Sequence, residues 1–371
     1  MRILIAGDFC PQKRVADKFE LGDFGYVLND VKELTAEADF SIVNFECPVT
    51  TGSELPIEKC GPNLCCGESG IEAVKWCGFD CVTLANNHFR DYGEEGCKHT
   101  LDICKKYNIE TVGGGFNLRD ASKTLYKEIK GKMVAIINCC EHEFSIATET
   151  TAGSNPLNPI RQYYEIQEAR QKSDYVIVIV HGGNEHYQYP SPRMKETYRF
   201  FVDAGADAVV NHHQHCYSGY EIYKESPIIY GLGNFCFDDD SSLNSCWNEG
   251  YITIVDFEEN RVSFSVRPYI QCGHFAKVEF VKDGKERDFY NEINSINDVI
   301  SNEESVRIHY QEFLDNSNIS FLFEPYSNRY MMALYRRKLL PSFVTKKRKL
   351  LVLAYLQCES HIEKIFNYLK R

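Results

Sequence analysis

The chain has 371 residues, 43% of them hydrophobic, which is enough to bury one large core or a large core with a small domain. Its formal net charge of -12 argues against general nucleic-acid binding. No stretch reaches about 18 uninterrupted apolar residues, so no membrane span is expected. A first strand that begins at Arg2 leaves no room for a signal segment, and sixteen cysteines set mostly in apolar strand runs or helix candidates indicate a reduced, cytoplasmic protein.

The chain opens with a pattern that recurs downstream, in which a short apolar run typical of a buried strand ends in polar residues. Residues 2–7 form the first run, and Asp8 follows it at the expected edge of a sheet. The next run carries Asn44 and Glu46, which point the same way because alternate residues of a strand share a face. Asp8 has the alternative role of a helix cap or turn former.

The third strand leads into the most polar group of the chain. The apolar run 81–85 continues directly into Asn86, Asn87 and His88, with Asp91 three residues further on. A buried strand delivers polar side chains to a site at its C-terminal end in this way, although an asparagine-rich turn is the alternative reading. The helices expected around these strands span residues 24–37, 69–77, 94–107 and 194–204. Loops expected to border the site span residues 49–68 and 141–164.

Two later strands deliver histidines. The residues that follow them are His181, Glu185, His212, His213 and His215. In extended backbone, His213 and His215 are i, i+2 partners whose imidazoles can reach one common cavity, which predicts metal ligation. A last strand-to-turn element ends near Asn234, and its glycines allow close backbone approach.

These strand-end residues together predict a metal centre. They offer carboxylate, amide and imidazole groups, a mixture that suits Mn, Fe or Zn, and they outnumber the ligands of a single ion. Two divalent ions bridged by a carboxylate would activate water at neutral pH and clamp a phosphoryl or carbonyl oxygen. The chemistry implied is hydrolysis.

Six short motifs contain these residues in order. They are Gly7-Asp8, Asn44-x-Glu46, Ala85-Asn86-Asn87-His88-x-x-Asp91-Tyr92-Gly93, His181-x-Gly183-x-Glu185, His212-His213-x-His215 and Gly231-Leu232-Gly233-Asn234-Phe235. The series resembles the successive motifs of the CapA family, whose members are named for capsule and poly-gamma-glutamate synthesis and are related to calcineurin-like metallophosphatases. The resemblance covers residues 1–240.

The resemblance implies an α/β fold, a four-layer α/β/β/α metallophosphatase-like sandwich, which we place in residues 1–275. It also implies the site roles. One ion would be held by Asp8, Glu46 and His215, and the other by Glu46, Asn87, His181 and His213. His88 would be the general acid that protonates the leaving group. Roles in orienting ligands or binding substrate would fall to Asn44, Asn86, Asp91, Glu185, His212 and Asn234.

Several positions depart from the family pattern. Cys10 stands where metallophosphatases carry a histidine two residues after the first aspartate, which leaves the first ion thinly coordinated and makes occupancy by one ion the alternative to two. Gly182 replaces a usual tryptophan, and Asn211 and Gln214 replace a usual glycine and proline. We expect these changes to reshape the pocket and to leave metal binding in place.

The C-terminal region differs from the rest and resembles no family. Residues 285–371 are helix-like and polar-aromatic. The segment from Arg329 to Arg371 contains eleven Lys or Arg but only two Glu. Such a helical appendage either docks on the acidic main domain or binds an anionic membrane lipid or acidic partner. The second reading would make the protein cytoplasmic and peripheral to the inner membrane face.

Two hypotheses of function remain from the sequence. The first is a metal-dependent hydrolase that acts on a phosphoester, or on an amide bond of a glutamyl polymer, during production of a bacterial surface polymer; its substrate would be an anionic polymer or a phosphorylated compound. The second is a non-catalytic, metal-binding component of a capsule-assembly complex that docks partner proteins through the helical tail. His88 favours the first, because a structural metal site needs no acid outside its ligand set.

Overall fold

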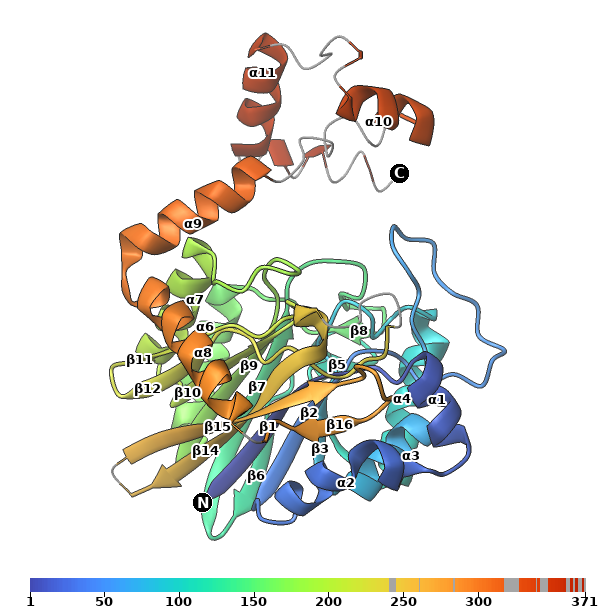
Figure 1. Ribbon diagram of the computed structural model, residues 1–371, viewed down its shortest axis with the longest axis vertical. Helices are drawn as coiled ribbons and strands as arrows, with labels where there is room; N and C mark the ends of the chain where they lie inside the picture. Colours follow the sequence, from blue (N-terminus) through green and yellow to red (C-terminus); the bar gives the residue numbers. More distant parts are fainter. Residues whose placement is uncertain are drawn as a thin grey trace. The chain divides into compact units, whose positions relative to one another are not determined.

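Two β-sheets and the helices around them form most of the chain (Figure 1). The computed structural model describes residues 1–239, 245–259, 261–282, 284–316, 327–337, 339–340, 346–357, 361–362, 364–365 and 369. The eight strands of the first sheet are β1 (Arg2–Phe9), β2 (Phe40–Phe45), β3 (Cys81–Thr83), β4 (Glu110–Val112), β13 (Asn234–Cys236), β14 (Glu249–Glu258), β15 (Arg261–Gln271) and β16 (Val278–Phe280). The six strands of the second are β6 (Leu125–Ile129), β7 (Lys132–Cys140), β9 (Tyr175–His181), β10 (Ala208–His212), β11 (Tyr220–Tyr223) and β12 (Ser226–Ile229).

The second sheet has a parallel centre with two antiparallel edges, whereas the first sheet is antiparallel only on the side of β14 to β16. In the first sheet the order is β16-β15-β14-β1-β2-β3-β4, with β13 beside β1, and β1 to β4 run parallel. In the second the order is β11-β12-β10-β9-β7-β6, and β7, β9, β10 and β12 run parallel. A two-stranded ladder pairs β5 (Gly114–Gly115) with β8 (Gly153–Ser154). The parallel strands therefore bring their C-terminal ends to one edge of each sheet.

Side-chain alternation along β1 explains the layering. Ile3 and Ile5 belong to the buried cluster shared with the second sheet, whereas Leu4 and Ala6 belong to the cluster beneath the first sheet's own helices. The helices of the larger unit are α1 (Lys13–Glu20), α2 (Phe24–Thr35), α3 (Ser69–Cys77), α4 (Gly93–Lys106), α5 (Leu118–Ala121), α6 (Pro159–Lys172), α7 (Pro192–Asp203) and α8 (Lys285–Ser301), with a short 3-10 turn, η1 (Cys246–Asn248). Helices α1 to α4 cover the first sheet and α6 and α7 cover the second, which confirms the four-layer α/β/β/α sandwich.

Some elements differ from the sequence-based expectation. The helix expected at 24–37 ends at Thr35, and helices α1 and α6 and strand β6 were not anticipated. The segment 141–164, expected to be irregular, is helical from Pro159 onward. Pro159 supplies a fixed φ at the first turn, and the Asn158 side chain accepts from the backbone N–H groups of Ile160 and Arg161, so this segment carries a helix start signal that its polar composition obscured.

The chain divides into two compact units, Met1–Tyr310 and Gln311–Arg371. Within the larger unit, α8 buries Ile293, Ile296 and Ile300 against the main core, so this part of the expected C-terminal region packs on the sheets. Helix α9 (Glu303–Asn316) continues from it, and α10 (Arg329–Arg336) and α11 (Lys346–Gln357) lie in the smaller unit. Within the described ranges, none of the helices combines the length and apolar character that a membrane crossing requires.

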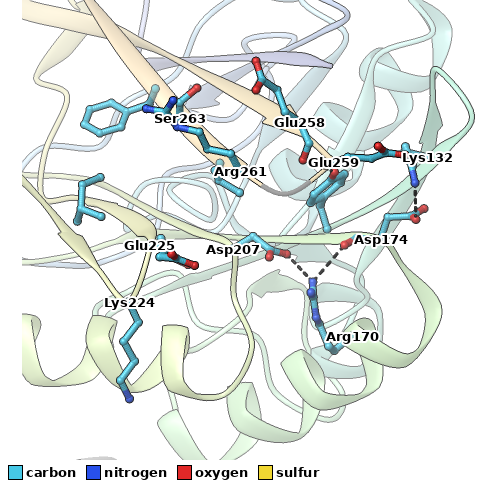
Figure 2. A pocket seen from close by; sticks show the side chains of 15 residues that line it. Lys132, Arg170, Asp174, Asp207, Lys224, Glu225, Glu258, Glu259, Arg261 and Ser263 are labelled. Carbon is cyan, nitrogen blue, oxygen red and sulfur yellow. Dashed lines mark hydrogen bonds and ion pairs between the residues drawn. The ribbon is translucent and has the colours of Figure 1, made fainter.

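A cavity of about 790 Å³ opens at the N-terminal ends of the second sheet's parallel strands (Figure 2). Its lining contains two ion pairs. Arg170 Nη1 lies 2.6 Å from Asp207 Oδ2, and Lys132 Nζ lies 3.3 Å from Asp174 Oδ1. The residues that carry the strand-end pattern lie at the opposite ends of these strands.

Candidate metal centre

The seven residues assigned to metal binding or acid catalysis converge on the C-terminal edge shared by the two sheets. Each of the seven is buried, with no more than 7% of its surface exposed. They are Asp8, Glu46, Asn87, His88, His181, His213 and His215. They come from β1, the ends of β2 and β3, and the ends of β9 and β10, so the site depends on the packing of one sheet on the other.

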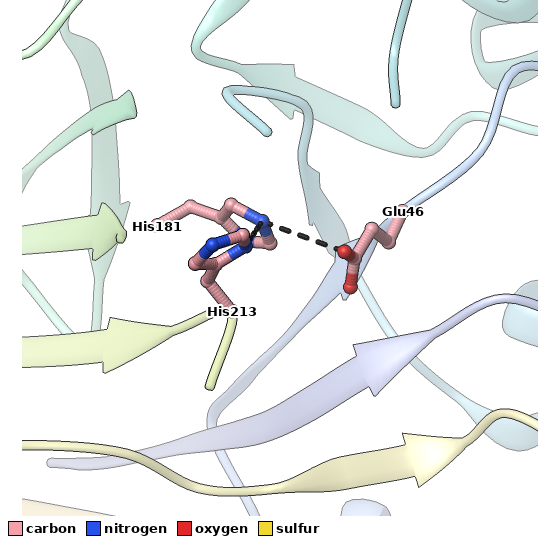
Figure 3. A group of neighbouring side chains, drawn as sticks. All are labelled: Glu46, His181 and His213. Carbon is pink, nitrogen blue, oxygen red and sulfur yellow. Dashed lines mark hydrogen bonds and ion pairs between the residues drawn. The ribbon is translucent and has the colours of Figure 1, made fainter. Parts of the chain in front are cut away.

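Two groups of ligand atoms share one carboxylate. Within each group the atoms lie within 4.8 Å of one another; the first group is Asp8, Glu46 and His215, and the second is Glu46, His181 and His213. Figure 3 shows the second group, in which Glu46 Oε1 lies 3.5 Å from His181 Nε2. His213 Nδ1 lies 3.1 Å from the same His181 nitrogen. The same residues stand in the two ligand sets that the resemblance implied, where the second set also included Asn87, and Glu46 is common to both.

Close backbone packing places Asp8. A Cβ on Gly7 would lie 2.0 Å from the carbonyl oxygen of Gly233, so only glycine permits this approach. The amide of Asp8 then donates to that oxygen at 3.2 Å, at a register irregularity between β1 and β13. The Asp8 carboxylate is held from the other side, because Asn44 Nδ2 donates to its Oδ1 at 2.7 Å.

The expectation of extended backbone at His213 and His215 is wrong, although the two rings do approach each other. Strand β10 ends at His212, and His213 and His215 have φ angles of 93° and 53°. Residues other than glycine rarely adopt positive φ angles. Such angles occur where surrounding contacts enforce them, often at functional sites. Here the His213 amide donates to Asp8 Oδ2 at 3.2 Å, which links this turn to the first sheet.

Glu46 is a buried carboxylate without hydrogen-bond partners among the described residues, and a cation would compensate for this. Both of its carboxylate oxygens are buried, and neither has a hydrogen-bond partner among the described residues. A buried carboxylate without partners is costly unless it is paired or coordinates a metal. The nearest ring nitrogens, His181 Nε2 at 3.5 Å and His215 Nε2 at 3.8 Å, are themselves ligand atoms. The residues present therefore fit a divalent metal.

The electrostatics of the site also favour the binding of a divalent metal. Burial lowers the pKa of His181 and His213 well below the usual value and lowers that of His215, so these imidazoles are neutral, which is the form that binds metal. Burial, followed by the charge of Glu46, raises the pKa of Asp8 to about 8. Burial also raises the pKa of Glu46. Without a bound cation, burial therefore favours the protonated form of both acids.

His88 lies at the edge of this site in a chain of polar contacts. Its Nδ1 lies 2.6 Å from Asp91 Oδ2, and because a carboxylate accepts, Nδ1 carries the proton. The Asp91 carboxylate also accepts from the amide of Leu64 at 2.7 Å and forms an ion pair with Lys59. Lys59 Nζ lies 3.2 Å from His88 Nδ1, and the side chains of Lys59 and Asp91 are 2% and 0% exposed. This arrangement leaves His88 Nε2 as the atom that can hold and release a proton.

Four of the remaining predicted residues orient their neighbours. Asn44 Nδ2 lies 3.3 Å from His181 Nδ1, and Asn86 Nδ2 donates to the carbonyl of Phe45 at 2.9 Å. His212 Nε2 donates to the carbonyl of Ala6 at 3.0 Å. Asn234 Oδ1 lies 2.9 Å from His215 Nδ1.

Glu185 differs from these four. It is exposed, and across the described ranges its carboxylate makes no hydrogen bond to a histidine of the site.

The departures from the family pattern have structural roles. Cys10 is fully buried, accepts from Gln12 Nε2 at 3.4 Å and belongs to neither ligand group. Asn211 Nδ2 donates to the carbonyl of Gly182 at 2.9 Å, and Gln214 Nε2 donates to that of Tyr187 at 2.7 Å. Asn211 and Gln214 therefore hold the loop after His181 against the turn that carries the later histidines.

Three residues at the site were not singled out from the sequence. Lys59 and Glu143 lie in the two loops expected to border the site, but nothing in their sequence context distinguishes them from other charged loop residues. Trp247 packs on His215 with ring centroids 4.8 Å apart, and it comes from η1, a turn with no strand-end pattern. Their proximity to the site is a product of tertiary packing.

The sequence model of a protein family described as "Bacterial capsule synthesis protein PGA_cap" matches residues 2–239. The capsule biosynthesis protein CapA of Bacillus anthracis is 33% identical over 246 residues, which cover 64% of this chain and 60% of that protein. The PGA biosynthesis protein CapA of Bacillus subtilis strain 168 is 33% identical over 211 residues, which cover 56% of each. The match thus spans less than two thirds of the length of these relatives.

Among solved structures, one titled a novel phosphatase from Mycoplasma pneumoniae superposes with a TM-score of 0.45 at 16% sequence identity. The superposition covers 73% of this chain and 93% of that one.

Proposed function

This chain belongs to the bacterial capsule synthesis family PGA_cap, and from that premise we propose that it is a metal-dependent hydrolase of surface-polymer biosynthesis. Its substrate would be a phosphoester or a glutamyl amide. The observation that carries the proposal is Glu46, a buried carboxylate shared by two ligand groups and lacking any hydrogen-bond partner among the described residues.

Asp8, Glu46 and His215 would hold one divalent ion, and Glu46, Asn87, His181 and His213 the other; mixed ligands of this kind suit Mn, Fe or Zn. When bound, such ions polarise a phosphoryl or carbonyl oxygen and lower the pKa of water. The buried, neutral histidines need lose no proton before binding, because burial already lowers their pKa.

His88 would protonate the leaving group. Asp91 fixes the imidazole by accepting from Nδ1 at 2.6 Å, so Nε2 holds the proton to be donated. Lys59 neutralises the Asp91 carboxylate, and this ion pair connects the loop after β2 to the residue that orients His88. His88 is 7% exposed, so the residues around it shield it from bulk water.

The experiment is metal analysis by elemental mass spectrometry on protein purified without chelator or a nickel column. We expect about two equivalents of Mn, Fe or Zn, and a lower content in His213→Ala, which removes a ligand of one ion. Metal-loaded protein would then be screened against phosphodiesters and glutamyl amides. Protein that binds no metal after repletion contradicts the hydrolase, whereas protein that binds metal and hydrolyses none of these compounds favours the non-catalytic, metal-binding assembly component.

The smaller unit carries a feature that favours a membrane-surface partner. Helix α11 begins with exposed Lys346, Lys347 and Arg348. Five apolar residues of its following turns are each at least 45% exposed, namely Leu350, Leu351, Leu353, Tyr355 and Leu356. A basic start followed by exposed apolar side chains is complementary to an anionic lipid surface. The partner we propose for this helix is therefore an anionic membrane face, beside which the site would act.

A further inference from the structure

Glu143 contacts Asn87 and His213, two of the residues proposed to hold the second ion, from a loop that supplies no ligand. It follows β7 in the segment that overhangs the site, and its side chain is 35% exposed. Its Oε2 accepts from Asn87 Nδ2 at 3.3 Å, and its Oε1 lies 3.5 Å from His213 Nε2. One carboxylate thus reaches an amide and an imidazole that both belong to the same proposed ion site.

The contact with Asn87 determines which way the amide faces. An ionised carboxylate can only accept hydrogen bonds, so the NH₂ group of Asn87 must be the end that faces Glu143. The amide oxygen then points to the opposite side, where Asn87 Oδ1 lies 3.0 Å from His181 Nε2. The oxygen, which is the only end of an amide able to bind a cation, is thereby presented to the ligand group.

The contact with His213 acts on the imidazole in the same way. At 3.5 Å this is an electrostatic contact and not a hydrogen bond, and a carboxylate at this distance favours a proton on Nε2, which leaves Nδ1 with a lone pair. Nδ1 is the inner nitrogen, 3.1 Å from His181 Nε2. The His213 backbone is already held by the hydrogen bond from its N–H to Asp8 Oδ2. A side-chain contact therefore sets only the rotation and protonation of the ring. Ligand histidines commonly donate their second nitrogen to a carboxylate, which fixes the tautomer and raises the basicity of the ligand nitrogen.

We propose that Glu143 is a positioning residue that fixes both the amide of Asn87 and the imidazole of His213 for one metal ion. This inference rests on the proposed metal site and assigns Glu143 no contact with the ion. The first ligand group has its own partners, since His215 Nδ1 lies 2.9 Å from Asn234 Oδ1. Loss of Glu143 should therefore weaken the second site and leave the first unchanged.

The test is cobalt binding to the full chain, followed by competition with a chelator and by the visible absorption of bound Co²⁺. Glu143→Ala removes both acceptors, whereas Glu143→Gln keeps one oxygen that can still accept from Asn87. We expect Glu143→Ala to lower the affinity of one of the two sites by about 10- to 100-fold and to alter the cobalt spectrum, with Glu143→Gln intermediate. The matched control is Glu141→Gln, which removes a carboxylate of the same loop whose partner is Arg193.

Each outcome decides between structural and positioning roles. Wild-type affinity and spectrum in both Glu143 variants would overturn the inference, as would an equal loss in the Glu141 control, because that would reflect disturbance of the loop. Metal-free unfolding midpoints should agree among the variants, since Glu143 lies at the rim. A wild-type chain that binds no cobalt would refute the proposed metal site itself, a result distinct from selective failure at Glu143.

Discussion

In the metal-free protein the free energy of unfolding should fall as pH rises, because Asp8 is buried without a compensating cation. Asp8 is 1% exposed, and burial, followed by the charge of Glu46, raises its pKa from 3.8 to about 8. Between these two values the unfolded chain has lost a proton that the folded chain retains. Stability is therefore highest below the lower value, and it declines until pH exceeds the upper one.

The magnitude follows from the size of the shift. One pKa unit corresponds to about 1.4 kcal/mol, so between about pH 5 and about pH 8 Asp8 alone should remove about 4 kcal/mol of stability. A typical domain has only about 5–15 kcal/mol in total. Asp8→Asn abolishes the titration, at a cost of about 1 kcal/mol for one of the two hydrogen bonds that Asp8 accepts from Asn44 and His213. Counted from below pH 3.8, the full loss in the wild type at about pH 8 is about 5 kcal/mol, so after the lost hydrogen bond the metal-free variant should exceed the wild type by about 4 kcal/mol.

The assay is urea unfolding of chelator-treated protein at the two pH values, with and without added divalent ion. Metal should stabilise the wild type by about 2.7 kcal/mol at a free concentration of about 100 times Kd, and Asp8→Asn by less. The reasoning is refuted if metal-free wild type shows no pH dependence in this window. It is also refuted if Asp8→Asn is the less stable protein at the higher pH.

Three further predictions concern other parts of the molecule. His88→Ala should keep its metal and lose hydrolysis by about 10²- to 10⁴-fold, as a general acid contributes; a variant with unchanged turnover rules out this role. Lys59→Met should destabilise the protein by about 3–5 kcal/mol in thermal unfolding, because it leaves the Asp91 carboxylate buried without its ion pair. The exposed Lys123, changed to Met, should cost less than about 1 kcal/mol, and equal losses would contradict the argument. Charge reversal at residues 346–348 should weaken cosedimentation with anionic vesicles by at least about 100-fold, at about 1 kcal/mol per basic residue; equal binding to zwitterionic vesicles would exclude the lipid surface.

Much of the architecture could be predicted because the buried strands have a clear sequence signal. The apolar runs before Asp8, Asn86 and His181 are each followed by polar residues, and parallel strands must bring such residues to one edge of a sheet. The elements that were missed carry weaker signals. Helix α6 is polar, and its start depends on Asn158 and a proline, while strand β6 is an edge strand in which only the last of five residues is fully buried.

Site residues that directly follow a strand could be identified from the sequence. Site residues that tertiary packing brings in from loops were missed. Asp8 and Glu46 could be placed from alternation and sequence position alone. His213 and His215 were placed close together for the wrong reason, since their left-handed backbone depends on contacts with the first sheet that local sequence does not encode. Glu143 approaches the site from a loop whose course is fixed by packing, for example by the Ser145 hydroxyl, which donates to the carbonyl of Asn87 at 2.7 Å.

The origin of the ligands has a consequence for the sandwich as a whole. Asp8 and Glu46 come from β1 and from the end of β2 in the first sheet, whereas His181 and His213 come from the end of β9 and from the turn after β10 in the second. An ion held by both sets would cross-link the sheets at their C-terminal edge alone, while the opposite edge contains the open cavity of Figure 2. Stripping the metal should therefore speed amide hydrogen exchange at the ends of β1 and β9 and leave exchange at their beginnings unchanged. The metal would then hold the two layers in register as well as serve the chemistry between them.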